Sequence, residues 1–233
     1  MKKAFLILLS AFLIFPALTA YTQEPIPDES LKPASGFYAG GQAATSGFGL
    51  NIRYILNERF TLKSGVETLK FNTDFEFDEN DVSYDASFNY KTGGVFLLAD
   101  YFYLPSLYVS AGAAFNQLNP KFTGQANDSY PYGDITIPKD KIGNFRIEME
   151  PSLKVSPYGG IGFRQFFGKN KRVVYNFETG LYYMGQPKVN IYADGLLAPT
   201  ADPAHGKQEL FEDQLQAYKF YPVLKMNIAV KLF

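Results

Sequence analysis

Seven charged residues stand at positions where alternation along a β-strand places them on the same face as glycine or tyrosine. They are Arg53, Lys63, Glu67, Asp100, Arg164, Glu178 and Lys225. Charges of both signs that are enclosed together form ion pairs, because an isolated buried charge is costly. If the connection after residue 167 is short, Arg164 lies diagonally from Glu178 and within reach of it. We expect a network of salt bridges that either fills and rigidifies an enclosed space or also admits a small zwitterion.

Metal and nucleophile chemistry has little support in the residue inventory. His205 is the only histidine, and the chain has no cysteine, so the ligand spacing of a zinc site is absent from the sequence. A lipid hydrolase needs only one histidine beside a serine and an acid, but no serine lies near His205 in the sequence. We therefore expect His205 to be an ordinary loop residue, and we expect no metal, no cofactor and no enzyme activity.

An acidic run, DFEFDENDVSYD, occupies residues 74–85. It lacks the glycine and the terminal glutamate of a calcium-binding loop. We expect a solvated hairpin, and the alternative is loose binding of Ca²⁺ or Mg²⁺. The Gly-Gly pairs, such as Gly159-Gly160, are not phosphate-binding loops because no helix is expected to follow them; they suit strand bends.

The stretch VVYNFETGLYYMGQPKVNIYADG, residues 173–195, shows the element that must position these charges. Apolar and polar residues alternate with a period of two, which indicates a strand with two unlike faces. The pattern continues to Ile191, although strands in globular proteins usually run to about 5–6 residues. The length of this strand therefore calls for a particular architecture.

Eight segments show this pattern, with short connections alternating with long ones. We expect strands at 36–43, 46–56, 59–73, 84–103, 106–120, 147–167, 173–193 and 217–233. Short turns are expected near residues 57–58, 104–105 and 168–171, and longer loops at 74–83, 121–146 and 194–216; the first hairpin, near 44–45, is short where a long loop is expected.

This organisation predicts an all-β fold: a closed antiparallel eight-stranded transmembrane barrel with short periplasmic turns and longer outer loops. Closure is required because an open sheet edge in lipid leaves backbone groups unpaired. The alternative is a soluble sandwich or lipocalin-like barrel with the opposite facing. Glycines on the polar faces, such as Gly160, Gly162 and Gly180, favour the membrane barrel, because small residues in a narrow lumen leave room for long neighbours.

The chain begins with Lys2 and Lys3, an apolar run, and Ala-Leu-Thr-Ala ending at Ala20, which predicts a secretory signal peptide over residues 1–20. We expect a flexible periplasmic leader at 21–35 and the barrel at 36–233. Aromatic residues make up 17% of the chain, 17 Tyr and 22 Phe without Trp, which fits interfacial aromatic girdles. A formal net charge of −1 argues against a nucleic-acid partner.

Five strings, in order along the chain, resemble the ornithine-uptake porin family, also known as carbapenem-susceptibility porins. They are GFGLNIRY (47–54), LYVSAGAAF (107–115), SPYGGIGF (156–163), ETGLYYMGQPKVNI (178–191) and YKFYPVLKMNIAVKLF (218–233). The resemblance implies a small eight-stranded barrel of the Gram-negative outer membrane. Uptake of basic and small amino acids has been linked to such proteins, and carbapenem entry has been proposed. The resemblance assigns no substrate-binding residues to this chain.

The C-terminus departs from the usual barrel-insertion signal. Phe233 ends the chain, but Lys231 stands two residues before it, and the apolar row is instead Leu224 to Leu232 at alternate positions. We still expect the barrel-assembly machinery to bind the C-terminal strand. Outer-membrane lipids and lipopolysaccharide are the other expected partners, and a small-molecule solute is a further one.

Two functions remain open at this stage, both in the cell outer membrane. One is a narrow passive channel for small solutes such as amino acids, which the charged lumen and the resemblance favour. The other is a closed, plugged barrel with a structural or surface-interaction role.

Overall fold

The computed structural model describes residues 35–79, 82–168, 171–202 and 207–233. The predicted signal peptide and the leader up to residue 34 lie outside the described residues. No helix in the described ranges combines the length and the hydropathy needed to cross a membrane.

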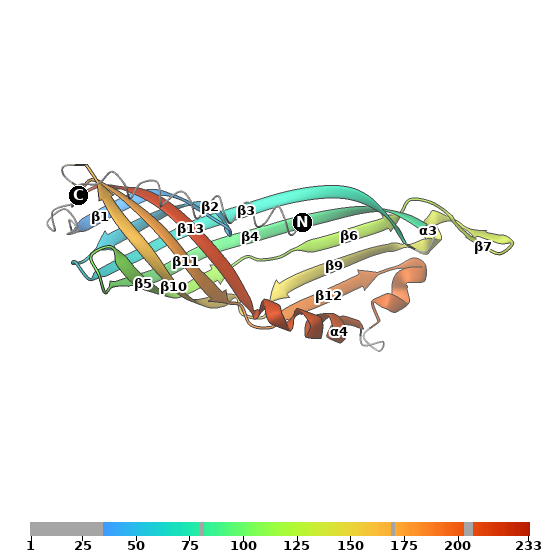
Figure 1. The fold of residues 1–233 in the computed structure, drawn as a ribbon. Coiled ribbons are helices and arrows are strands. Elements are labelled where there is room, and N and C mark those ends of the chain that lie inside the picture. The colour runs from blue at the N-terminus through green and yellow to red at the C-terminus, as the bar shows by residue number, and fades with distance from the viewer. Residues whose placement is uncertain (1–34, 80–81, 169–170, 203–206) are drawn as a thin grey trace, which may run out of the picture. The chain divides into compact units, whose positions relative to one another are not determined.

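Eight strands pair in a closed ring (Figure 1). The ring runs β4, β3, β2, β1, β13, β11, β10 and β5, and a β4–β5 pairing closes it; every pairing is antiparallel. Their bounds are β1 Gly36–Ala44, β2 Gly47–Ile55, β3 Phe60–Glu79, β4 Val82–Phe102, β5 Leu107–Asn116, β10 Val155–Phe167, β11 Val173–Tyr183 and β13 Phe220–Lys231. The predicted eight-stranded antiparallel barrel is confirmed.

Beyond one rim of the barrel, β3 and β4 continue and the same sheet adds three strands, forming the extension, which is ordered β12-β9-β6-β4-β3 (Figure 1). Its added strands are β6 Lys121–Ala126, β9 Asn144–Pro151 and β12 Pro187–Ala193. The remaining elements are the β7–β8 hairpin, Tyr130–Tyr132 and Ile135–Ile137, α3 Lys139–Ile142, η1 Gly195–Thr200, α4 Lys207–Gln214 and η3 Leu215–Lys219.

The connections at the two rims differ as expected. The β2–β3, β4–β5 and β10–β11 turns lie at the same rim as the start of β1 and the end of β13. The extension stands at the opposite rim, where the β1–β2 hairpin is a tight turn at Thr45-Ser46. A barrel with both termini beside its short turns has the arrangement of bacterial outer-membrane barrels.

Two predicted strands, 147–167 and 173–193, are each interrupted. The first divides into β9 and β10, and the second into β11 and β12. The break in the second strand falls at Met184-Gly185-Gln186, where Gly185 has a φ of +70° and the amide of Leu153 donates to the Met184 carbonyl at 3.0 Å. The two breaks lie side by side, and beyond them the two segments pair again as β9 and β12 in the extension.

The three predicted outer loops are more ordered than expected. In place of a loop at 74–83, β3 and β4 stay paired out to Glu79 and Val82. The 121–146 segment contains β6, the β7–β8 hairpin and α3, and the described part of 194–216 is largely helical. Phe75 and Phe77 alternate with acidic residues, and this period of two indicates that β3 continues here. The acidic composition of the segment had instead favoured a loop.

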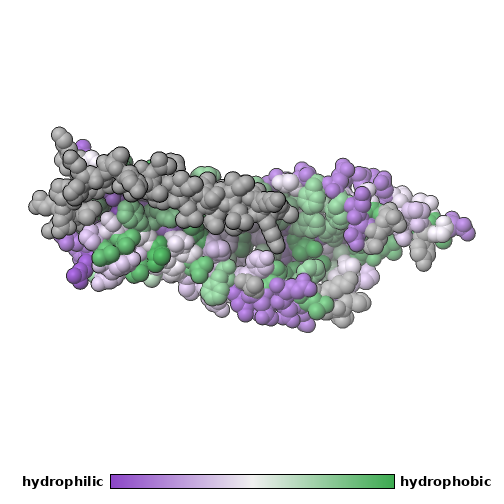
Figure 2. Space-filling model, in the orientation of Figure 1, coloured by the Kyte–Doolittle hydropathy of each residue, from purple (hydrophilic) through white to green (hydrophobic). Residues whose placement is uncertain are grey.

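The outward face of the barrel is apolar. Along β13 and the residue that follows it, the residues at alternate positions from Leu224 to Leu232 are 41–60% exposed. Val223, which precedes this row, and Ala229, which lies within it, are buried. With Phe220 included, this row spans about 30 Å along the barrel axis at about 3.3 Å per residue and a tilt near 40°. Figure 2 shows apolar patches over the barrel strands and strongly hydrophilic residues gathered over α4.

The extension has its own apolar face, on the side that continues the lumen. Phe75, Phe77, Phe122 and Phe145 contact one another with ring centroids 5.8–6.4 Å apart, except for Phe122 and Phe145 at 5.4 Å. The buried side chain of Tyr84 stacks on Phe77 at 5.3 Å. Aromatic packing of this kind supports the extension without disulfides.

Inward-facing glycines make room for tyrosines. A Cβ on Gly162 meets the ring of Tyr108, and a Cβ on Gly160 or Gly180 meets the hydroxyl end of Tyr158. An eight-stranded barrel is only wide enough for side chains to fill it, so each large inward side chain needs a small neighbour.

We predict that Gly162→Ala lowers the free energy of unfolding by about 1–3 kcal/mol, because the methyl group overpacks the lumen against Tyr108. Urea unfolding in detergent micelles, followed by tyrosine fluorescence, measures the change. Gly159→Ala on the same strand is the matched control, since nothing lies within 4 Å of its Cβ. Equal stability of the two variants would contradict a tightly filled lumen.

Candidate functional site

The candidate site is the polar network inside the barrel. All seven charged residues singled out in the sequence are buried there, with exposed fractions between 1% and 7%. They come from six strands, β2, β3, β4, β10, β11 and β13. Their burial follows from strand alternation, which turns their apolar neighbours outward.

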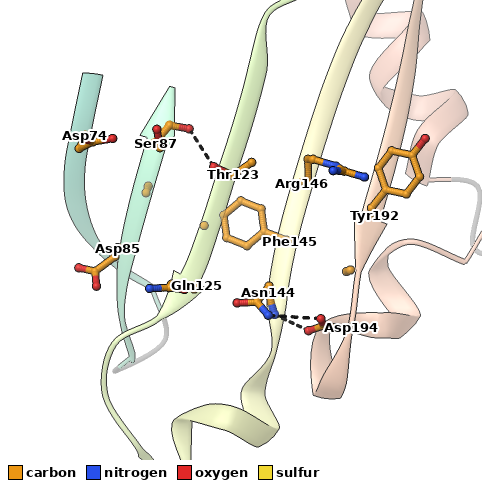
Figure 3. Close-up of a pocket in the computed structure, with 13 residues that line it drawn as sticks. Asp74, Asp85, Ser87, Thr123, Gln125, Asn144, Phe145, Arg146, Tyr192 and Asp194 are labelled. Atoms are coloured by element: carbon orange, nitrogen blue, oxygen red, sulfur yellow. Dashed lines mark hydrogen bonds between the residues drawn. The ribbon is translucent and has the colours of Figure 1, made fainter. Parts of the chain in front are cut away.

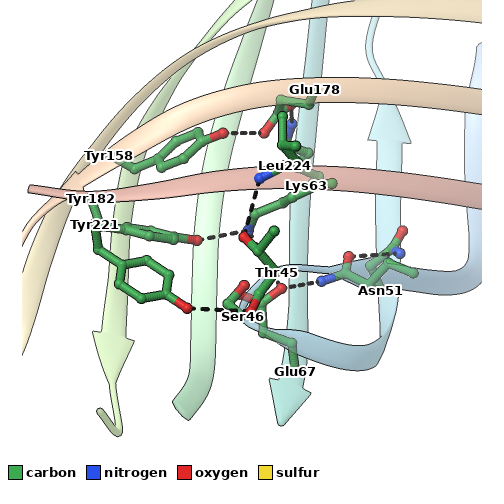
Figure 4. A network of polar contacts seen from close by, with 12 residues as sticks. Thr45, Ser46, Asn51, Lys63, Glu67, Tyr158, Glu178, Tyr182, Tyr221 and Leu224 are labelled. Carbon is green, nitrogen blue, oxygen red and sulfur yellow. Dashed lines mark hydrogen bonds and ion pairs between the residues drawn. The ribbon is translucent and has the colours of Figure 1, made fainter. Parts of the chain in front are cut away.

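Lys63 is the centre of the network. Its Nζ lies 2.8 Å from Asp100 Oδ1 and also contacts the carboxylate of Glu178. The hydroxyl of Tyr158 donates a hydrogen bond to the other carboxylate oxygen of Glu178 at 2.7 Å. Since β3 and β11 are not neighbours in the ring, the Lys63–Glu178 pair spans the lumen (Figure 4).

A second group lies nearer the rim that carries the extension. Lys225 Nζ is 3.5 Å from Glu67 Oε2 and donates to the hydroxyl of Tyr182 at 2.7 Å. Gln42 Nε2 and the hydroxyl of Ser46 each donate to Glu67 at 2.6 Å (Figure 4). Every oxygen of Glu67 therefore has a donor, which offsets the cost of burying its charge.

The two arginines are held differently. Arg164 Nη1 donates to Thr61 Oγ1 at 3.3 Å, and its guanidinium lies 3.5 Å from the centre of the Phe102 ring. Arg53 donates to the side-chain oxygen of Asn227. In the described part of the chain neither arginine lies within ion-pair distance of a carboxylate.

The expected contact between Arg164 and Glu178 does not form. The register places Asn176 opposite Arg164 and Gly162 opposite Glu178, so the diagonal relation was right. However, both oxygens of Glu178 are occupied, one by Lys63 and the other by Tyr158. The charges thus divide into two paired groups and a pair of arginines.

Sequence reasoning did not single out three uncharged members of the network, Gln42, Ser46 and Thr61. Gln42 lies on the inward face of β1 with Tyr38 and Gly40, so alternation alone indicates its facing. Ser46 stands in the β1–β2 turn, and Thr61 begins the inward row of β3. No spacing rule reveals which carboxylate each of these residues would meet across the lumen.

The extension carries an open pocket of 670 Å³ on its outward face (Figure 3). Arg146 lies 4.5 Å from the ring centre of Tyr192, beside it on the next strand. Asp194 accepts a hydrogen bond from the amide of Asn144 at 2.5 Å and another from its side chain at 3.3 Å. These bonds to Asn144 lower the pKa of the fully exposed Asp194 carboxyl.

Within the described ranges, no three His, Cys, Asp or Glu side chains are grouped closely enough to hold a metal ion. His205 lies outside the described residues. The absence of enzyme activity and of a loosely bound cation near the acidic run stay predictions.

Comparison with solved structures shows that this fold is similar to those of CarO proteins. CarO2 from Acinetobacter baumannii is 20% identical, with a TM-score of 0.55 covering 85% of this chain and 100% of that one. CarO from Acinetobacter baumannii is 21% identical, with a TM-score of 0.52 covering 83% and 96%. This chain shares the CarO fold. The resemblance found in the sequence is thereby confirmed at the level of the CarO-like barrel.

Comparisons by sequence add no further relatives. No protein-family model matches the chain, and no curated protein matches it. The role of the network must therefore be argued from its own geometry.

We predict that Lys63→Met lowers the free energy of unfolding by about 3–5 kcal/mol, because Asp100 and Glu178 would remain buried without their shared cation. Glu178→Gln should cost less, since Lys63 keeps Asp100. Urea unfolding in micelles compares them with Lys188→Met, which removes an exposed lysine of β12. Equal stability of the Lys63 and Lys188 variants would show that the network contributes nothing.

A second prediction concerns pH. The pKa of Asp194 is lower in the folded chain than in the unfolded one, so its bonds to Asn144 stabilise the loop above the unfolded pKa. That contribution is lost as pH falls through the folded pKa. We expect amide exchange at Asn144 to become faster in Asp194→Ala at neutral pH, measured relative to Asp134→Ala, which alters an exposed aspartate between β7 and β8. An unchanged exchange rate would show that Asp194 does not hold this amide.

Proposed function

We propose that this protein is an outer-membrane barrel whose lumen is closed at rest by its own ion pairs, and whose extension meets the exterior. The observation that carries this proposal is the Lys63–Glu178 pair, which joins opposite walls of the barrel. The expected structural or surface-interaction role then falls to the extension and not to the lumen.

The outward apolar surface supports the location in the outer membrane. Side chains that are 41–60% exposed along β13 are unfavourable in water and favourable in lipid. A closed ring also leaves no strand edge unpaired within the hydrocarbon. The fold shared with CarO and CarO2 supports the same location.

The packing around the network supports closure. Tyr108, Tyr158 and Tyr182 are 1–5% exposed and fill the space beside the inward glycines. Tyr158 and Tyr182 also contact each other, with ring centroids 4.7 Å apart. A solute could pass only if tyrosines and ion pairs moved together.

A narrow passive channel for small solutes such as amino acids is the second candidate. The charged lining of the lumen favours it, since all seven charged side chains of the network face inward. Arg53 and Arg164, which pair with no carboxylate among the described residues, would offer a transient site for the carboxylate of a zwitterion. The resemblance to ornithine-uptake porins points the same way.

Two expected partners belong to the same proposal. The barrel-assembly machinery would bind β13, whose outward row ends at Leu232 and whose Lys231 lies on the opposite face. Lipids would cover the barrel exterior.

We predict that proteoliposomes carrying the folded protein take up radiolabelled glycine and ornithine no faster than empty liposomes. The closed state follows from the pair across the lumen, so Lys63→Ala combined with Glu178→Ala should raise uptake. Migration in SDS gels before and after heating checks that each barrel is folded. Uptake by the unaltered protein that falls in Arg53→Ala or Arg164→Ala would instead establish the channel.

A further inference from the structure

A group of lysines occurs where the barrel meets the extension. Lys70 on β3 and Lys91 on β4 are direct register partners, and both are exposed. Like charges directly opposite each other destabilise a strand pair. The described residues give neither lysine an ion-pair partner, so this repulsion is left uncompensated by the protein.

Lys70 and Lys91 line a pocket with a volume of 780 Å³, and two further lysines border it. Lys154 is exposed and, within the described ranges, has no ion-pair partner. Lys121 is 3.0 Å from Glu148. The only carboxylate among the lining residues is Glu150, which accepts a hydrogen bond from Asn119 at 3.1 Å. The pocket therefore carries an excess of positive charge.

The position of these lysines along the barrel axis, relative to the apolar outer surface, indicates which molecule they could bind. Lys70 follows Val66 by four residues on the same outward face, and Lys91 precedes Val95 by four. Val66 and Val95 are 51% and 49% exposed. The lysines thus stand just beyond the apolar surface, where the head groups of the outer leaflet begin.

The rest of the lining suits a sugar. Asn72 and Asn89 are register partners two residues beyond the lysines on the same face. Asn116 ends β5, and Gln117 and Asn119 follow it in the connection to β6. Amide groups donate and accept hydrogen bonds, as sugar hydroxyls require. Lysines supply the point charges that bind phosphate.

We propose that Lys70, Lys91 and Lys154 bind the phosphorylated sugar head group of an outer-leaflet glycolipid, such as lipid A. The phosphate lies between Lys70 and Lys91 and relieves their repulsion, and the amides contact the sugar. The inference rests on the proposed outer-membrane location, but it is independent of whether the lumen is open.

Native mass spectrometry of the detergent-purified full chain tests the proposal with bisphosphorylated lipid A as the added lipid. We expect Lys70→Gln combined with Lys91→Gln to weaken binding at least about tenfold, because each lysine supplies a charge-assisted hydrogen bond to the phosphate. Lys154→Gln alone should weaken it less. Lys188→Gln, which alters an exposed lysine outside the pocket, should bind as the unaltered protein does.

Dephosphorylated lipid A and inorganic phosphate separate the possible sources of binding. Loss of binding with the dephosphorylated lipid, and none with inorganic phosphate at the same concentration, is the expected result. Equal binding by the double variant, or binding of inorganic phosphate as tight as that of lipid A, would overturn the inference.

Fractionation of cell membranes keeps this test distinct from that of the proposed function. Absence of the chain from the outer-membrane fraction would overturn both. Recovery in that fraction, with lipid binding unaffected by the lysine substitutions, would overturn only the glycolipid site.

Discussion

The structure depends on main-chain pairing that continues past the rim of the barrel. β4 pairs with β3 along its whole length, and its other edge pairs first with β5 and then with β6. Between them, the amides of Gln117 and Asn119 donate to Gly93 and Lys91, each at 2.9 Å, so the edge is hardly interrupted. The same hydrogen-bonded wall thus forms part of the membrane barrel and most of what stands outside it.

The narrowness of the ring determines what the lumen contains. Eight strands leave space for one layer of inward side chains, and strand alternation brings charged residues and tyrosines into it. Water cannot solvate charges so confined, and therefore Lys63 and Glu67 each need partners from other walls. In the closed barrel that we propose, the seal is a by-product of satisfying buried charge.

The sequence was informative about facing and much less informative about partners. A period of two identified the barrel strands, and it correctly turned Lys63, Glu178 and Lys225 inward, because facing is a local property of an extended chain. Which carboxylate meets Lys63 depends on ring curvature and register across strands that are far apart in sequence. The extension was missed for a related reason. The alternation runs on through the breaks at residues 152–154 and 184–186, so it does not show that β9 and β12 leave the ring, and the acidic segment 74–78 and the segment 121–146 resemble loops in composition although they pair as strands.

The part of β3 that lies in the extension, after Thr68, has one edge that no strand in the described ranges covers, because β2 pairs with β3 only as far as Thr68. Such an edge is a template for intermolecular strand addition. Asp74, Glu76 and Asp78 stand at alternate positions along this part of β3. If a second molecule of this protein paired through the same edge of β3, its acidic residues would face the acidic residues of the first. Such like charges would repel one another and oppose strand addition, and salt would screen that repulsion. The exposed edge thus gives the acidic run a structural reason for its charge, whether or not it also binds a cation.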